Sequence, residues 1–352
     1  MTYLNVADYE REAERVLDAG PFGYFAGGAG DEGTLHDNVA AFSRWRLRPR
    51  VLVDVGEVTT AATVLGREVS MPLLVAPTAF QRLAHADGEI ATARGAAAAG
   101  TVMCLSTLSS VAPRELAAAS PGSRLWFQLY WSADRGFTAD LLAQVAEAGF
   151  EALVLTVDFA AAGRRERDLR NAFTLPDDLA TPNIPGALQR RDFHAALGEI
   201  VDNTLTWRDL EWLREHSALP LLLKGILSAE DALLAAEHGV AGVIVSNHGG
   251  RQLDGVAASL DALPEVVEEV GERVEVLMDG GIRRGTDVLK ALALGARAVL
   301  VGRAVVWGLA VGGEQGVRDV LELLRAEVAL GLTHLGCRSP ADVTGAHARR
   351  AG

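Results

Sequence analysis

Short apolar runs alternate along this chain with alanine-rich stretches that have helical spacing. The runs cover residues 72–76, 102–106, 124–130, 152–157, 220–224, 242–246, 274–278 and 298–302. Each has the length of a strand that is buried on both faces, as strands are in parallel sheets. Strands that alternate with helices predict an α/β fold with a parallel sheet, and eight such units predict a closed (β/α)8 TIM barrel.

An open, doubly wound sheet is the alternative architecture. Such a sheet normally carries a G-x-G-x-x-G turn after its first strand. Here the first run is followed by APTAFQR, which contains no glycine. The barrel is therefore the preferred prediction.

Two segments lie outside the repeating pattern. We expect residues 1–70 to form an N-terminal helical extension that caps the barrel bottom or adds a lid. Residues 159–205 form a long connection after the fourth strand, and loops of that length in compact domains are usually functional. We therefore expect a single domain over 1–352, with the barrel at 71–330 and a C-terminal tail at 331–352.

Charge and cysteine content exclude several classes of protein. The formal net charge of -13 argues against nucleic acid as the main partner. Cys104 and Cys337 are the two cysteines, too few for a disulfide framework or a zinc site, and they fit a reducing compartment. No apolar run approaches the roughly 20 residues that span a bilayer. The expectation is a cytoplasmic protein with no metal and no membrane association.

A largely polar set of residues, with a few glycine, alanine and proline positions, gathers where the predicted strands end, which is where barrel enzymes place their chemistry. They are Pro77, Thr78, Ala79, Ser106, Gln128, Tyr130, Thr156, Asp158, Lys224, Ser246, His248, Asp279, Gly281, Arg283, Gly302 and Arg303. A lone serine or threonine at such a place is more often a helix cap. A lysine inside an apolar run is harder to explain structurally, because its burial is costly unless the charge is paired. The joint pattern favours an active site.

The last two strands predict a phosphate site. The segment DGGIRRGTD precedes a helix, so its backbone N–H groups and Arg283 can face an anion. Gly302 and Arg303 follow the eighth strand, and phosphate binding after strands seven and eight recurs in barrels.

The sixth strand ends in SNHGGRQLDG, which brings a base and a cation into one loop. His248 titrates near neutrality, as a general base should, and Arg251 offers a planar fork for a carboxylate. Asp158 could orient the imidazole and stabilise its protonated form. The sequence lacks the G-x-S-x-G, H-E-x-x-H and Walker motifs of hydrolases, metalloproteases and nucleotide-binding loops.

Long motifs in the chain resemble the FMN-dependent 2-hydroxy-acid oxidase and dehydrogenase family. They include IVSNHGGRQLDG, MDGGIRRGTDVLKALALGA, LTVDFAAAGRRERDLRN and YFAGGAGDEGTLHDN, and the likeness runs over nearly the whole chain. The resemblance implies an FMN-binding barrel, in agreement with the strand count.

The resemblance also implies a role for each part of the cofactor site. The residues along the N5 side of the flavin would be Pro77, Thr78 and Ala79. Hydrogen bonds to the ring would come from Ser106, Gln128 and Thr156. Lys224 would stabilise negative charge on the reduced ring, and Ser246 and Asp279 would lie at the ribityl chain. The phosphate would be held by Gly281, Arg283, Gly302 and Arg303.

For the substrate, the resemblance implies that Arg165 and Arg251 clamp a carboxylate with help from Tyr24. Tyr130 would bind the hydroxyl oxygen. His248 would be the base, with Asp158 behind it. The implied reaction is oxidation of an (S)-2-hydroxy acid to the 2-oxo acid, with O2 reduced to hydrogen peroxide. The family also implies a homotetramer or octamer.

One difference between this sequence and the glycolate oxidases indicates which side chain the substrate carries. Plant glycolate oxidases have tryptophan where Leu108 stands, and TLSSV with WFQLYW is similar to the hydroxymandelate oxidases. We therefore expect mandelate or 4-hydroxymandelate, because apolar pockets discriminate by volume. Four alternatives remain: an oxidase of lactate, glycolate or another aliphatic hydroxy acid, an FMN-dependent isomerase, a Schiff-base aldolase that uses Lys224, and a flavin-binding protein without turnover.

Overall fold

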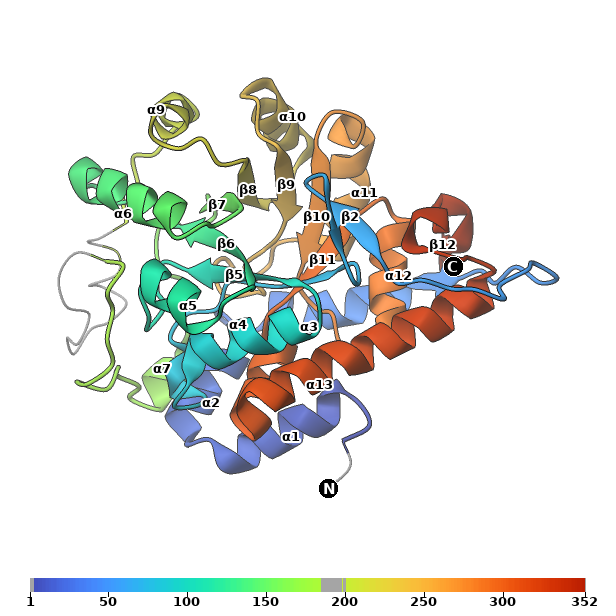
Figure 1. Ribbon diagram of the computed structural model, residues 1–352, viewed down its shortest axis with the longest axis horizontal. Helices are drawn as coiled ribbons and strands as arrows, with labels where there is room; N and C mark the ends of the chain where they lie inside the picture. The colour runs from blue at the N-terminus through green and yellow to red at the C-terminus, as the bar shows by residue number, and fades with distance from the viewer. Residues whose placement is uncertain (1–2, 185–197, 199–200, 352) are drawn as a thin grey trace.

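Eight parallel strands close into a barrel at the centre of the computed structural model, which describes residues 3–184, 198 and 201–351 (Figure 1). The strands are β4 (Leu73–Val75), β5 (Val102–Ser106), β6 (Arg124–Leu129), β7 (Ala152–Thr156), β8 (Leu221–Ile226), β9 (Gly242–Val245), β10 (Glu275–Asp279) and β11 (Ala298–Val301). Consecutive strands are neighbours, and β11 pairs with β4 to close the ring. The predicted (β/α)8 TIM barrel is confirmed.

Helices surround the barrel and follow its strands. They are α4 (Gly88–Ala98), α5 (Pro113–Ala119), α6 (Arg135–Glu147), α7 (Glu166–Arg170), α9 (Asp209–His216), α10 (Ala229–Glu237), α11 (Ser259–Val270), α12 (Gly285–Ala293) and α13 (Arg303–Leu335). Helices such as α4, α10, α11 and α12 pack on the outer face of the strands, and most strand residues are buried.

The core has two layers because successive side chains of a strand point to opposite faces. Along β4, Leu74 points into the barrel with Trp126 and Leu222, in a cluster that fills the interior. Its neighbours Leu73 and Val75 belong to the outer cluster, which packs under the helices. Burial on both faces explains why the strands are continuous apolar runs in the sequence.

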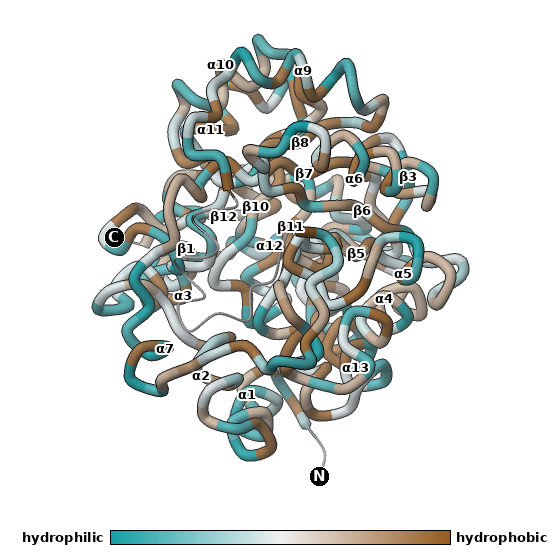
Figure 2. The backbone as a smooth tube through the Cα atoms, turned by 90° about the vertical axis from the view of Figure 1, so that its left-hand side faces the viewer, coloured by the Kyte–Doolittle hydropathy of each residue, from teal (hydrophilic) through white to brown (hydrophobic). Residues whose placement is uncertain are grey.

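The N-terminal extension contributes to both ends of the barrel. Its hairpin of β2 (Ala62–Val64) and β3 (Arg67–Val69) adds Val64 and Val69 to the interior cluster. The N–H of Leu65 at the hairpin turn donates to the carboxylate of Glu275, at the start of β10, over 3.0 Å. The helices α1 (Val6–Val16), α2 (Ala19–Ala26) and α3 (Gly33–Ala40) precede this hairpin. Figures 1 and 2 place α1 and α2 at one side of the molecule, opposite α9 and α10.

The last strand of the chain pairs with a short strand of the N-terminal extension. β1 (Trp45–Leu47) pairs in antiparallel fashion with β12 (Ala348–Arg350). Helix α13 runs on to Leu335 and ends at Gly336, whose φ of 73° suits a left-handed helix cap. The boundary expected at residue 330 therefore falls inside this helix.

The long connection after β7 contains α7 and then runs toward α9. Part of this predicted segment, 185–197 and 199–200, lies outside the described residues. In the described part of the chain, no helix is long and apolar enough to cross a membrane.

Candidate active site

A cavity lies at the carboxyl ends of the barrel strands, and we call it the site cavity. It encloses about 1040 Å³ of space that holds no protein atoms, and this volume includes open solvent. The residues of the predicted site that line it are Tyr24, Pro77, Thr78, Ala79, Ser106, Gln128, Tyr130, Thr156, Arg165, Lys224, His248, Arg251, Asp279, Gly281, Arg283, Gly302 and Arg303. The two others, Asp158 and Ser246, lie directly behind this wall, bonded to its residues.

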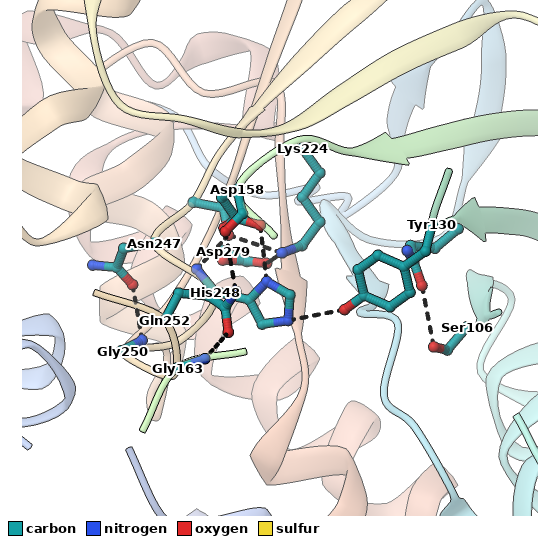
Figure 3. A network of polar contacts seen from close by, with 12 residues as sticks. Ser106, Tyr130, Asp158, Gly163, Lys224, Asn247, His248, Gly250, Gln252 and Asp279 are labelled. Atoms are coloured by element: carbon teal, nitrogen blue, oxygen red, sulfur yellow. Dashed lines mark hydrogen bonds and ion pairs between the residues drawn. The ribbon is translucent and has the colours of Figure 1, made fainter. Parts of the chain in front are cut away.

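His248 sits at the centre of a hydrogen-bonded chain (Figure 3). Its Nδ1 lies 2.9 Å from Oδ1 of Asp158, and its Nε2 lies 3.3 Å from the hydroxyl of Tyr130. Its own N–H donates to Oγ of Ser246. The loop holds His248 in a left-handed conformation with φ of 59°, which is uncommon outside glycine and is found at functional sites.

The imidazole of His248 is poised as a base. Burial lowers its pKa below the ordinary 6.5, Lys224 and Arg165 lower it further, and Asp158 opposes the shift without reversing it. The ring is therefore neutral near pH 7. Because the Asp158 carboxylate accepts from Nδ1, the proton resides on Nδ1 and leaves Nε2 free to take another, an assignment made from the hydrogen-bond network.

Asp158 remains a carboxylate. Burial alone would raise its pKa, but His248 and Lys224 together hold the pKa below its usual value. Its second oxygen, Oδ2, is buried without a hydrogen-bond partner among the described residues. Gly225 permits this packing, because a Cβ there would lie 2.6 Å from the Cβ of Asp158.

Lys224 is a buried ammonium group at the barrel mouth. Its Nζ donates to Oγ of Ser246 over 2.9 Å and lies 3.1 Å from Oδ2 of Asp279. Although burial acts to lower the pKa of Lys224, Asp279 and Asp158 raise it above its ordinary value. The ion pair with Asp279 explains how Lys224 can lie inside an apolar run, because a buried lysine needs a compensating carboxylate. Figure 3 shows the pair beside the His248–Asp158 bond.

Arg165 and Arg251 place two positive charges at one side of the site cavity. Nη1 of Arg251 donates to the carbonyls of Tyr24 and Gly27, and its guanidinium lies 4.9 Å from the Tyr24 ring centre. Arg165 is 5% exposed and lies 5.8 Å from the same ring. Burial and then the charge of Arg165 lower the pKa of Arg251 to about 10, so Arg251 stays cationic at neutral pH. Two buried cations so close together favour a bound anion.

Gln128 supplies a buried donor to the cavity. Its Oε1 accepts from Oγ of Ser106 over 3.1 Å and from the N–H of Thr107 over 3.3 Å. These bonds orient the amide so that Nε2 is the remaining group, and this nitrogen is buried without a protein partner among the described residues. A buried donor of this kind is satisfied by a ligand acceptor.

The other end of the cavity has the features of an anion site. Gly280 and Gly281 follow β10 with φ of 102° and 78°, and a Cβ at Gly281 would collide with the carbonyl of Asn38. Helix α13 begins at Arg303, so the N–H groups of its first turn are at the cavity edge. Arg283 lines the same region, with Nη1 bonded to the carbonyl of Ile282.

Arg303 also has a structural role, which the sequence did not predict. Its guanidinium donates to the carbonyls of Phe25, Gly27 and Gly249 over 2.8–3.0 Å. Arg303 therefore ties α2 and the His248 loop to the start of α13, in addition to bringing its charge to the cavity.

Four further side chains of the site were not among the residues predicted from the sequence. Nε2 of Gln252 donates to the carbonyls of Asp158 and Ala161, and its Oε1 accepts from the N–H of Gly163 (Figure 3). Asn38 of α3 pairs with Asn247 beside His248. Phe159 packs on Tyr130 with ring centres 4.9 Å apart. Gln252 and Asn247 lie within the SNHGGRQLDG motif, but their partners are far away in the sequence.

These residues fit a flavin mononucleotide. The unpartnered Nε2 of Gln128 and the ammonium of Lys224 suit the polar edge of a flavin ring, and the α13 N-terminus with Arg283 suits its phosphate. The two arginines and His248 remain available to a second, anionic molecule.

Comparisons with known proteins agree with this chemistry. The family model for FMN-dependent dehydrogenases matches residues 13–350. L-lactate oxidase of Nostoc sp. is 50% identical, over 97% of this chain and 96% of its own length. Glycolate oxidase of Spinacia oleracea is 46% identical, over 99% and 96%.

Solved structures of mandelate oxidase are similar over nearly the full length. One with (S)-4-hydroxymandelic acid has a TM-score of 0.94 at 44% identity, with 99% of both chains covered. Another structure of mandelate oxidase has a TM-score of 0.92 at 46% identity, with 97% of both covered. The chain therefore belongs to the FMN-dependent dehydrogenase family, and its cofactor is FMN.

Proposed function

We propose that this chain oxidises an (S)-2-hydroxy acid, mandelate or 4-hydroxymandelate, to the 2-oxo acid, and that O2 is reduced to hydrogen peroxide. One observation carries the proposal: Arg165 and Arg251 lie in the same cavity as the Tyr130–His248 pair. A carboxylate bound to the cations would bring the neighbouring carbon and its hydroxyl group to the base. Such positioning removes much of the entropic barrier of the reaction.

Tyr130 would donate a hydrogen bond to the substrate oxygen. Burial, reinforced by the charge of Asp158, raises the pKa of Tyr130, so its hydroxyl group keeps its proton at neutral pH. A phenol in this state donates to the hydroxyl oxygen of the substrate and to the carbonyl oxygen of the product.

His248 would remove a proton from the substrate through Nε2. Asp158 would stabilise the imidazolium that forms, as a carboxylate does behind other catalytic histidines. When bound, FMN supplies the acceptor for the two electrons that leave the substrate. Loss of two electrons and two protons converts the alcohol carbon into a ketone.

The remaining predicted residues would hold the cofactor. Pro77, Thr78 and Ala79 are proposed to lie along the ring, and the ring would be hydrogen-bonded by Ser106, Gln128 and Thr156. Lys224 would stabilise negative charge on the reduced ring, with Ser246 and Asp279 near the ribityl chain. The proposed phosphate ligands are Gly281, Arg283, Gly302 and Arg303.

The aromatic substrate is supported by two observations. Leu108 is a cavity-lining residue and is smaller than tryptophan, so it leaves more room in the cavity than tryptophan would. The mandelate oxidase structure with (S)-4-hydroxymandelic acid is similar to this chain over 99% of its length. A second candidate, oxidation of lactate, is supported by the 50% identity to L-lactate oxidase of Nostoc sp..

A comparison of substrates tests the proposal. The purified enzyme is assayed in air with (S)-mandelate, (S)-4-hydroxymandelate, (S)-lactate and glycolate, and both the 2-oxo acid and peroxide are measured. We expect the highest kcat/KM for an aromatic acid, with one peroxide formed per 2-oxo acid. A higher kcat/KM for lactate would select the second candidate. Product without peroxide would make the enzyme a dehydrogenase that uses another electron acceptor.

We also propose that the enzyme is a cytoplasmic homotetramer or octamer. The support is the family membership together with the reduced, widely separated cysteines Cys104 and Cys337. Light scattering after size-exclusion chromatography measures the mass of the assembly directly.

A further inference from the structure

Phe159 borders two cavities at once. It comes directly after Asp158, its side chain is 4% exposed, and it lines the site cavity. Together with Thr156, it also lines a second cavity, on the outside of the barrel, which we call the outer cavity. The outer cavity encloses about 1090 Å³, open solvent included, and its walls include Leu155, Leu205 and Leu223. Phe159 therefore belongs to the walls of both cavities.

The ring also contacts both members of the proton-handling pair. Its centre lies 4.9 Å from that of Tyr130 and 6.3 Å from that of His248. Tyr130 and His248 are themselves joined over 3.3 Å. Truncation of Phe159 would leave a gap beside two polar groups that can bind water, and polar gaps fill with water whereas apolar ones stay dry.

We propose that Phe159 is a positioning residue that separates the His248–Tyr130 pair from the outer cavity and so keeps water away from the base. The inference extends the function proposed above by naming what excludes solvent from its reaction centre. Exclusion of water strengthens every electrostatic interaction within a site.

The charges around His248 make this separation measurable. Asp158 faces the ring from the end of β7, Lys224 from β8, Arg165 from the segment before α7 and Tyr130 from the end of β6. Burial is the largest cause of the low pKa of His248. Substitution of Phe159 removes none of these charged groups, and the Phe159→Leu variant separates an effect of hydration from a shift of the neighbouring Asp158.

The test compares three variants with the unmodified, FMN-loaded enzyme. Phe159→Ala joins the two cavities, and we expect the pKa of His248 to rise toward its ordinary value, by roughly half a pH unit or more. Phe159→Leu keeps an apolar side chain in place and should leave the pKa close to that of the unmodified enzyme. The matched control, Leu205→Ala, enlarges the outer cavity at a residue that does not line the site cavity, and should cause no shift.

The primary readout does not depend on turnover. Labelled imidazole carbons are followed by NMR against pH, and the signal of His248 is assigned by its loss in His248→Gln. The acidic limb of the kcat/KM profile should move upward by the same amount. If Phe159→Ala binds FMN but leaves the pKa of His248 unchanged, or if Leu205→Ala shifts it equally, the proposal is wrong.

Two further outcomes are distinguishable. If Phe159→Ala does not fold, Phe159→Val makes a smaller opening, and its expected shift is in the same direction. The other outcome is that the unmodified enzyme oxidises no hydroxy acid while the pKa of His248 still rises in Phe159→Ala. That combination would overturn the proposed function and leave the separation by Phe159 standing.

Discussion

His248 combines a low pKa with a bond to a carboxylate, and these two features set the pH dependence of the reaction. The base must be neutral to accept a proton, so kcat/KM should rise with pH through the pKa of His248 and stay level above it. Because burial holds that pKa below 6.5, the acidic limb of the profile should lie below pH 6.5. A limb at or above pH 7 would contradict the assignment of His248 as a buried, neutral base.

Removal of the imidazole should abolish oxidation without loss of the cofactor. His248 lies in the loop after β9, whereas the groups suited to FMN lie along β5, β6, β8 and at the start of α13. We expect His248→Gln to bind FMN normally and to slow its reduction by substrate roughly 10²–10⁴-fold, the range for general bases. Stopped-flow absorbance measures both properties, and a rate within a factor of two of the unmodified enzyme would exclude His248 as the base.

Asp158 should act through His248. Its charge raises the pKa of the imidazole, so Asp158→Asn should move the acidic limb to lower pH and also lower kcat, because the imidazolium loses its partner. The expected loss of kcat is at least about tenfold. A limb that moves to higher pH would show that Asp158 has a different role.

The residues of the site differ in how well the sequence could predict them. His248, Arg251, Lys224 and the glycines belong to local motifs whose chemistry is readable at short spacing. Phe159 and Asn38 carry no such signal, because their importance depends on contacts with residues about 30 to 200 positions away. Only the closed barrel brings those partners together.

At the scale of elements, the two halves of the candidate substrate site lie on two loops that contact each other. The segment after β7 carries Asp158 and Arg165, and the loop after β9 carries His248 and Arg251. Gln252 bonds the two loops together, and Gly163 lets them approach. The relative placement of Arg165 and Arg251 therefore depends on the contact between these two loops.

Gly163→Ala tests whether the contact between the two loops positions the arginines. A Cβ at this position would lie 2.2 Å from the carbonyl oxygen of Arg251, so the backbone of one loop must move. We expect KM for the hydroxy acid to rise about tenfold or more, as a misplaced cation binds the carboxylate less well, while FMN stays bound. Gly312→Ala is the control, because a Cβ there meets nothing within 4 Å. Steady-state kinetics measure KM for both variants. Equal KM values for Gly163→Ala and Gly312→Ala would show that the loop contact does not position the arginines.

The elements themselves were predictable to unequal degrees. All eight barrel strands coincide with the apolar runs, since strands buried on both faces carry an uninterrupted signal. The β2–β3 hairpin and the β1–β12 pairing have three residues per strand, which is too short for a recognisable period. The extent of α13 is hard to predict because it consists of two helical segments that meet at a kink, where the backbone of Gly312 and Gly313 is not helical.

At the scale of the whole molecule, the cofactor should contribute to stability. A ligand that binds only the folded chain stabilises it by about 2.7 kcal/mol when present at 100 times its dissociation constant. For a chain of this size, removal of FMN should lower Tm by roughly 5 °C or more. Differential scanning fluorimetry before and after reconstitution checks this expectation. An unchanged Tm would mean that FMN does not bind the folded chain in preference to the unfolded one.

The most direct test of the account is the visible spectrum of the purified protein during anaerobic addition of (S)-mandelate. The account predicts a yellow flavin spectrum that bleaches on addition and returns when air is admitted. Retention of the yellow colour with mandelate, 4-hydroxymandelate, lactate and glycolate alike would contradict the proposed 2-hydroxy-acid oxidation.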